Sequence, residues 1–220
     1  LADTVSRWTV IHTRFVRIYP LIRLGRSAEA RENAGVLAAD ARKLGTSIME
    51  AAAHQQLAIL DMADGELASA RHHIDEVGRL SPGEPMFEIG CLAQQMWLAH
   101  LEGDHHGALD QVARLGELPY PELMTAMHGW LAGAAGDNDA SAVATGELAA
   151  IDLSALPTTW VTPGLWMVAA ELAVRHRHAG LAAQVLPLLE RLSGEMVIFV
   201  CNFVVGSADE ALADLRELLR

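Results

Sequence analysis

The chain has 220 residues, a formal net charge of −12 and a hydrophobic fraction of 51%. The hydrophobic fraction excludes a disordered tail, and the acidic balance argues against a nucleic-acid surface, which needs basic residues to displace counterions from phosphates. Alanine and leucine dominate while aromatic residues make up only 5%, and this composition favours closely packed helices over a β-rich core.

The cysteines and the apolar runs bear on the cellular location of the protein. Cys91 and Cys201 lie far apart without a CxxC motif, so reduced cytoplasmic thiols are expected rather than a disulfide framework. No stretch approaches the roughly 20 apolar residues of a membrane helix, and the longest apolar run, MVIFVCNFVV, contains Asn202. Because the chain begins at Leu1 without a secretory signal, we expect a cytoplasmic piece of a longer protein, without a cofactor.

A recurring turn predicts helix hairpins along the chain. The stretch GELASARHHIDEVGRLSP, residues 65–82, has a turn glycine and then Ala70, Ile74 and Val77 at helical spacing. The same frame returns at steps of 33 to 41 residues. The predicted turn positions are Gly25, Gly65, Gly103, Gly136 and Arg177, the last standing where glycine is expected. We therefore expect five hairpins, followed by an amphipathic C-terminal helix in ADEALADLRELLR.

Small and apolar residues recur on both helices of each predicted hairpin. The inner face of each second helix is expected to carry Ala30, Ala34, Leu37, Ala70, Ile74, Val77, Ala108, Val112, Leu115, Ser141, Thr145, Leu148, Ala182, Leu186 and Leu189. Seven residues before the turns lie Ile18, Ala58, Met96, Gly129 and Ala170, which are mostly small or slender. Such residues let the two helices approach closely, and stacked hairpins complete one another's core.

This frame resembles the tetratricopeptide repeat. In unit two the resemblance is carried by Ala58, Gly65, Ala70, Ile74, Val77 and Pro82. It implies an all-α fold of antiparallel helix hairpins that form a right-handed α-solenoid, as a single helical-repeat domain over residues 1–220. The chain departs from the pattern in that most steps exceed the standard 34 residues. Pro20 also lies inside the first helix, where proline is expected to kink it.

The segment from His176, with GLAAQVLPLLERLSG, the apolar run and GSAD, resembles the helical-repeat region of large bacterial regulators. These include LuxR-type transcription regulators related to the maltose activator and fusions of cyclase and ATPase modules. The resemblance implies a signalling module that senses a small-molecule effector or binds a protein or peptide. The chain contains no GxxxxGK[ST] loop, so ATPase and DNA-binding parts would lie elsewhere. Neither nucleic-acid nor membrane contact is expected, and a homo-oligomer is possible.

The resemblance also implies a ligand groove along the first helix of each hairpin. The residues after the small positions are Tyr19, Ile59, Trp97, Trp130 and Glu171. The candidate groove residues are Phe15, Tyr19, Arg23, Trp97, His100, Trp130 and Arg175. Aromatic residues suit binding surfaces because they provide rigid contact area. The alternative is that Trp97 and Trp130 fill wide spaces between irregular units, and the sequence leaves both interpretations open.

An enzymatic alternative is a helical metal-dependent hydrolase that uses His72 with Glu76 and Asp104 with His105. Zinc sites need three or four convergent ligands, and HExxH is absent. We therefore expect no metal site, no catalytic residue and a non-catalytic interaction module or scaffold.

Other reactive side chains are also expected to be structural. His72 and His73 should be solvated on the outer face of their helix. The paired carboxylates Asp209 and Glu210 should face outward, and no GxSxG motif surrounds a serine. The two cysteines lie in apolar segments, where a thiol is usually inert.

Overall fold

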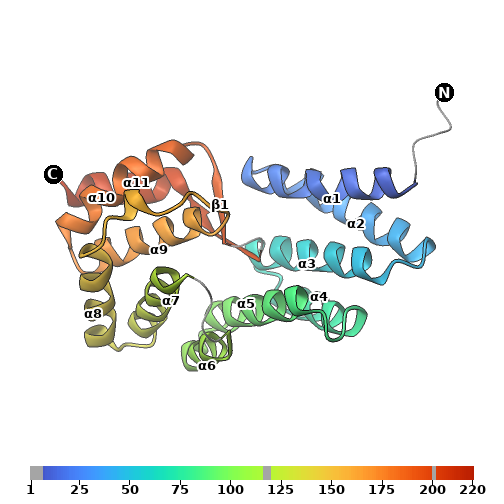
Figure 1. Ribbon diagram of the computed structural model, residues 1–220, viewed down its shortest axis with the longest axis horizontal. Helices are drawn as coiled ribbons and strands as arrows, with labels where there is room; N and C mark the ends of the chain where they lie inside the picture. Colours follow the sequence, from blue (N-terminus) through green and yellow to red (C-terminus); the bar gives the residue numbers. More distant parts are fainter. Residues whose placement is uncertain (1–6, 116–119, 200–201) are drawn as a thin grey trace. The chain divides into compact units, whose positions relative to one another are not determined.

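The computed structural model describes residues 7–115, 120–199 and 202–220 (Figure 1). These residues are mostly helical and include one two-stranded sheet. The predominantly α-helical class predicted from the composition is therefore confirmed, whereas the solenoid arrangement stays a prediction. Within the described ranges, no helix has the length and apolar character needed to cross a membrane.

The chain forms two compact units. The first holds the described residues up to Leu98 together with Asn202 and Phe203, and the second holds those from Ala99 to Phe199 and from Val204 onward. In the first unit α1 packs against α2, α2 against α3 and α3 against α4, and α1 also contacts α3. Its helices are α1 (Arg7–Arg23), α2 (Ser27–Lys43), α3 (Ser47–Ala63), α4 (Leu67–Leu80) and most of α5 (Pro85–Leu101).

The second unit is built around α9. This helix contacts α7, α8, α10, α11 and the strand β1, so most of its surface is covered by neighbours. The elements of the unit are α6 (His105–Leu115), α7 (Pro121–Ala134), α8 (Asn138–Ala149), η1 (Leu153–Ala155), α9 (Thr162–Arg175), α10 (Ala179–Leu189), η2 (Glu190–Leu192), β1 (Met196–Phe199), all but the first residue of β2 (Phe203–Ser207) and α11 (Ala208–Leu218).

All five predicted turns adopt the left-handed backbone conformation. At Gly65, φ is +78°, and the N–H of Glu66 donates to the carbonyl of Asp61 at 2.8 Å. Arg177, predicted to stand in for glycine, has φ of +49°, and the N–H of His178 donates to Ala173 at 2.8 Å. This hydrogen bond back into the last helical turn is the Schellman closure. The frame in the sequence therefore locates five left-handed turns, each between two consecutive helices.

The inner-face residues of the second helices are buried as predicted, except Leu115 and Leu186, which are half-buried. The five residues upstream of the turns are buried as well. Gly129 shows why one of these positions is small: a Cβ there would clash with the Cβ of Ala144 on α8. Close packing of α7 on α8 thus depends on the missing side chain.

The apolar segment after α10 adds a small sheet to this predominantly helical chain. Residues 196–199 form β1 and residues 203–207 form β2, in agreement with their content of valine, isoleucine and phenylalanine. Phe199 of β1 packs over Gly164 of α9, where a Cβ would lie 2.6 Å from the phenyl ring. Pro20 lies inside α1 as predicted.

Replacing Gly129 with alanine should lower the free energy of unfolding by about 1–3 kcal/mol, because the new methyl group overpacks the α7–α8 contact. Gly146→Ala is the matched control, since Gly146 also lies within a helix but has open space around it. The control should be neutral or stabilising by up to about 1 kcal/mol. Urea unfolding measures both, and equal effects would contradict the close approach.

Arg177→Gly should raise the free energy of unfolding by about 1 kcal/mol, because glycine adopts a left-handed conformation without the Cβ penalty. Arg177→Ala provides the control, since it removes the side chain but retains the Cβ. The alanine variant should not be stabilised. If both variants gain the same stability in urea unfolding, backbone strain at this turn is not the cause.

Candidate functional site

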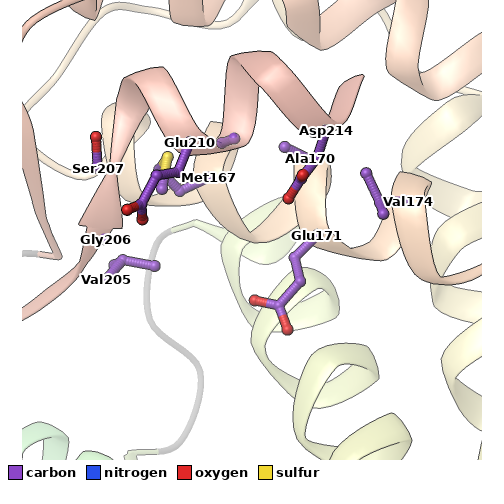
Figure 2. Close-up of a pocket in the computed structure, with 10 residues that line it drawn as sticks. Met167, Ala170, Glu171, Val174, Val205, Gly206, Ser207, Glu210 and Asp214 are labelled. Carbon is purple, nitrogen blue, oxygen red and sulfur yellow. The ribbon is translucent and has the colours of Figure 1, made fainter. Parts of the chain in front are cut away.

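An open pocket of about 340 Å³ lies between α9, β2 and α11 in the second unit (Figure 2). Its floor is apolar and its rim carries carboxylates. The apolar lining comes from Met167, Ala170, Val174, Val205 and Ala211, and the polar lining from Glu171, Ser207, Glu210 and Asp214, with Gly206 between them. A cavity of this size matches a small organic ligand or a few side chains of a partner.

Helical spacing explains how α9 contributes to this pocket. Met167, Glu171 and Val174 are separated by four and three residues, so they share one face of the helix. Glu171 follows the small residue Ala170, at the position that the sequence analysis assigned to the groove. The pocket therefore lies on the face of α9 that carries Glu171, whereas Arg175, the candidate groove residue on this helix, does not line it.

The helix α11 forms the opposite wall because its own apolar face is anchored. Ala208, Leu212 and Leu215 are buried, and α11 packs on α9 and α10. Glu210 and Asp214, four residues apart, then project into the pocket from α11 (Figure 2). Asp209 and Glu210 are exposed, as expected, and Glu210 also lines the open pocket.

The rim carries more negative than positive charge. Glu171 forms an ion pair with Arg175 one turn later, with 3.4 Å between Oε1 and Nη2. Neither Glu210 nor Asp214 has an ion-pair partner within the part of the chain that the structure describes. Arg216, the cation of α11, pairs with Glu190 at 3.0 Å. Two carboxylates at the pocket thus remain uncompensated.

Three of the predicted groove residues come together in the second unit. The rings of His100 and Trp130 lie 4.4 Å apart between centroids. Arg175 lies along α7, where a Cβ on Gly133 would be 2.8 Å from Nη1 of Arg175. Trp130 is only 3% exposed, so it fills space between helices rather than offering a surface.

The other predicted groove residues lie in the first unit. Trp97 is 7% exposed and stacks on Phe203, with ring centroids 4.3 Å apart and planes 8° from parallel. Phe15, Tyr19 and Arg23 are half-buried on α1. Burial of both tryptophans favours the interpretation that they fill space. A ligand-facing role for Phe15, Tyr19 and Arg23 stays a prediction.

A buried polar network on α3 and α4 changes the interpretation of His73. Its Nδ1 lies 2.8 Å from Nδ1 of His54, and its Nε2 lies 3.6 Å from Oδ2 of Asp61. Asp61 is also paired with Arg31, which binds Asp64 at 2.8 Å. His72 is exposed as expected, but the expectation of a solvated His73 is wrong because its ring is half-buried against α3.

The residues proposed for a metal-dependent hydrolase have other partners. Glu76 pairs with Arg79 at 2.6 Å, and Asp104 accepts the N–H of Gly107 at 2.9 Å, which stabilises the start of α6. The described residues contain no group of three or more histidine, cysteine or acidic side chains that could hold a metal ion.

The turn histidine and the acid at the start of α11 are also used structurally. His178 accepts the N–H of Leu181 at 3.0 Å and so caps α10. Asp209 accepts a hydrogen bond from the hydroxyl of Ser193 at 2.8 Å. Burial raises the pKa of the Cys91 thiol to about 11, which keeps it protonated and unreactive. Cys201 lies outside the described residues.

Comparison with known proteins does not indicate a function for this chain. No protein-family model matches the chain, and no curated protein or solved structure is significantly similar to it. The function is therefore argued from the pocket, its charges and the helices that form it.

The stability of the protein should fall as the pH drops below 6.5, because three histidines are held neutral. Burial is the main cause that lowers the pKa of His54 and His73. Burial, His105 and Arg175 together lower the pKa of His100 to about 4 from the ordinary 6.5. A lowered pKa means that the unfolded chain takes up the proton first, so the stabilisation is complete above pH 6.5 and is lost toward pH 4.

For His100 the loss amounts to at most about 3 kcal/mol. Urea unfolding at a series of pH values measures it. His100→Gln should flatten the pH dependence, whereas His128→Gln, at an exposed position, should leave it unchanged. Equal slopes for the wild type and His100→Gln would contradict the assignment.

Proposed function

We propose that this chain is a non-catalytic, tetratricopeptide-like binding module of a bacterial transcription or signalling regulator, and that its ligand occupies the pocket on α9. The observation that carries the proposal is the position of this pocket. It opens on α9, the first helix of the fifth predicted hairpin, beside Glu171, and the resemblance to the tetratricopeptide repeat would assign this face to the groove. The apolar floor and the carboxylate rim together suit binding through both contact area and charge.

The composition of the pocket supports binding rather than chemistry. Its lining includes no histidine, the side chain that most often activates a serine hydroxyl such as that of Ser207. The carboxylates of Glu210 and Asp214 are exposed to solvent.

The walls of the pocket suggest how binding is transmitted. Glu171 belongs to α9, whereas Glu210 and Asp214 belong to α11, so a ligand that touches both helices favours one distance between them. Such a ligand shifts the equilibrium only if its affinity differs between two arrangements of α11. In a regulator, neighbouring modules that contact α11 would then respond to the change in its position.

A second candidate function is that of a protein–protein scaffold that associates with itself. It is favoured by large apolar side chains that are exposed on α1 or directly after it, namely Val10 at 39%, Val16 at 49% and Leu24 at 60%. Burying such side chains between two copies is favourable in proportion to their apolar area. Sedimentation over a range of concentrations tests this candidate, because a strictly monomeric protein contradicts it.

A fragment screen monitored by NMR tests the pocket. Ligands should shift the methyl signals of Met167 and Val205, and Ala211→Trp should abolish these shifts because the indole fills the pocket. Ala183→Trp is the control, since Ala183 is an exposed position on α10. The proposal fails if hits instead shift Leu156 and Leu165, which line a separate cavity.

A further inference from the structure

We propose that the ligand of the α9 pocket is an alkyl cation, an ammonium or guanidinium group at the end of an aliphatic chain. This inference rests on the proposed function and adds the chemical class of the ligand. The same chemistry is found in a free aliphatic amine and in a lysine or arginine side chain of a partner protein. The aliphatic part would lie on the pocket floor and the cation between the carboxylates of α11.

The charge of the rim is the first part of the argument. Glu210 and Asp214 lie four residues apart on α11, where like charges repel each other. Arg175 forms an ion pair with Glu171, and Arg216 forms one with Glu190. Among the described residues, Glu210 and Asp214 therefore have no cation as an ion-pair partner. A bound cation would relieve this repulsion, whereas an anion would increase it.

Helix stability does not explain Asp214. Acids stabilise the first turn of a helix, where the helix dipole is positive, and this effect falls off beyond that turn. Asp209 and Glu210 stand in the first turn of α11, but Asp214 lies beyond it. Asp214 has no capping or ion-pair role within the described residues. Its carboxylate is therefore available to a ligand in the pocket that it lines.

The pocket floor is the second part of the argument. Met167, of which 7% is exposed, and Val174 form an apolar surface on α9, and Val205 extends it on β2. A bare metal cation would gain no binding free energy from this apolar surface, because hard metal cations are coordinated by oxygen ligands. An alkyl cation matches both parts, because its chain covers the apolar floor while its charged head remains at the rim.

The overall charge of the protein supports the same class of ligand. With a formal net charge of −12, the chain attracts cations over a distance and repels anions, and salt weakens this attraction. Binding of an alkyl cation should therefore weaken as the salt concentration rises, whereas binding of a neutral compound of the same shape should not.

The experiment uses the chain with three probes of equal length: pentylamine, pentanol and pentanoate. Binding is followed through the NMR signal of the Met167 methyl group. Pentylamine should bind with at least about tenfold higher affinity than pentanol, and pentanoate should not bind. Asp214→Asn should reduce pentylamine affinity about tenfold, whereas Glu217→Gln, which removes a charge from α11 outside the pocket, should change it little. Unfolding of both variants in urea confirms that they are folded.

Each outcome separates this inference from the proposed function. If pentanol and pentylamine bind equally well at Met167, the pocket binds ligands but the cation inference is wrong. If no probe shifts Met167, the inference is again wrong, and the fragment screen decides about the pocket. A capped tripeptide with a central lysine distinguishes the two sources. Tighter binding of the tripeptide than of pentylamine indicates a basic side chain of a partner, and the reverse indicates a free amine.

Discussion

One backbone conformation, the left-handed residue after each first helix, determines how the hairpins form. At Gly65 and at Arg177 alike, this residue lets the next N–H return to a carbonyl in the last turn of the preceding helix. The chain then reverses within two or three residues, and the second helix starts against the first. Arg177 adopts this conformation although it has a Cβ, because the packing of α10 on α9 outweighs the local strain.

The left-handed turn at Arg177 places α10 against α9, and the face of α9 that its neighbours leave open forms one wall of the pocket. The hairpin places α10 on one side of α9, while α7 and α8 cover others, so only a limited face remains for a ligand. The strand β2 and the helix α11 border that face. The sheet also positions α11. The strand β2 ends at Ser207 and α11 begins at the next residue, which brings Glu210, in the first turn of α11, to the pocket.

Within the helical core of the first unit, buried polar side chains form a network that connects three helices. His54 is 7% exposed and Asp61 2% exposed, and burial of such groups is costly unless they are paired. His73 bridges the two, and Arg31 supplies the positive charge for Asp61. The network joins α2, α3 and α4 through directional contacts, which apolar side chains alone do not provide.

Local periodicity allowed the sequence by itself to determine the turn positions, the inner faces of the second helices and the predominantly helical class. These features depend on residues within a few positions of one another, such as Gly65 and Ala70, or Arg177 and Ala182. Pattern alone could not place Trp97, which is buried by stacking on Phe203, more than a hundred residues away in the chain. Nor could it pair His73 with His54 across two helices.

The pocket itself was decided only by the tertiary structure. Glu171 was assigned to a groove because helical spacing reveals its face, but a face becomes a pocket only when another segment forms the opposite wall. That wall is α11, whose Glu210 and Asp214 are about forty residues further along the chain. Their approach to α9 depends on the strands that precede α11 and on the burial of Leu212 and Leu215. Contacts between such distant segments leave no period in the sequence, which is why the helices could be predicted and the site could not.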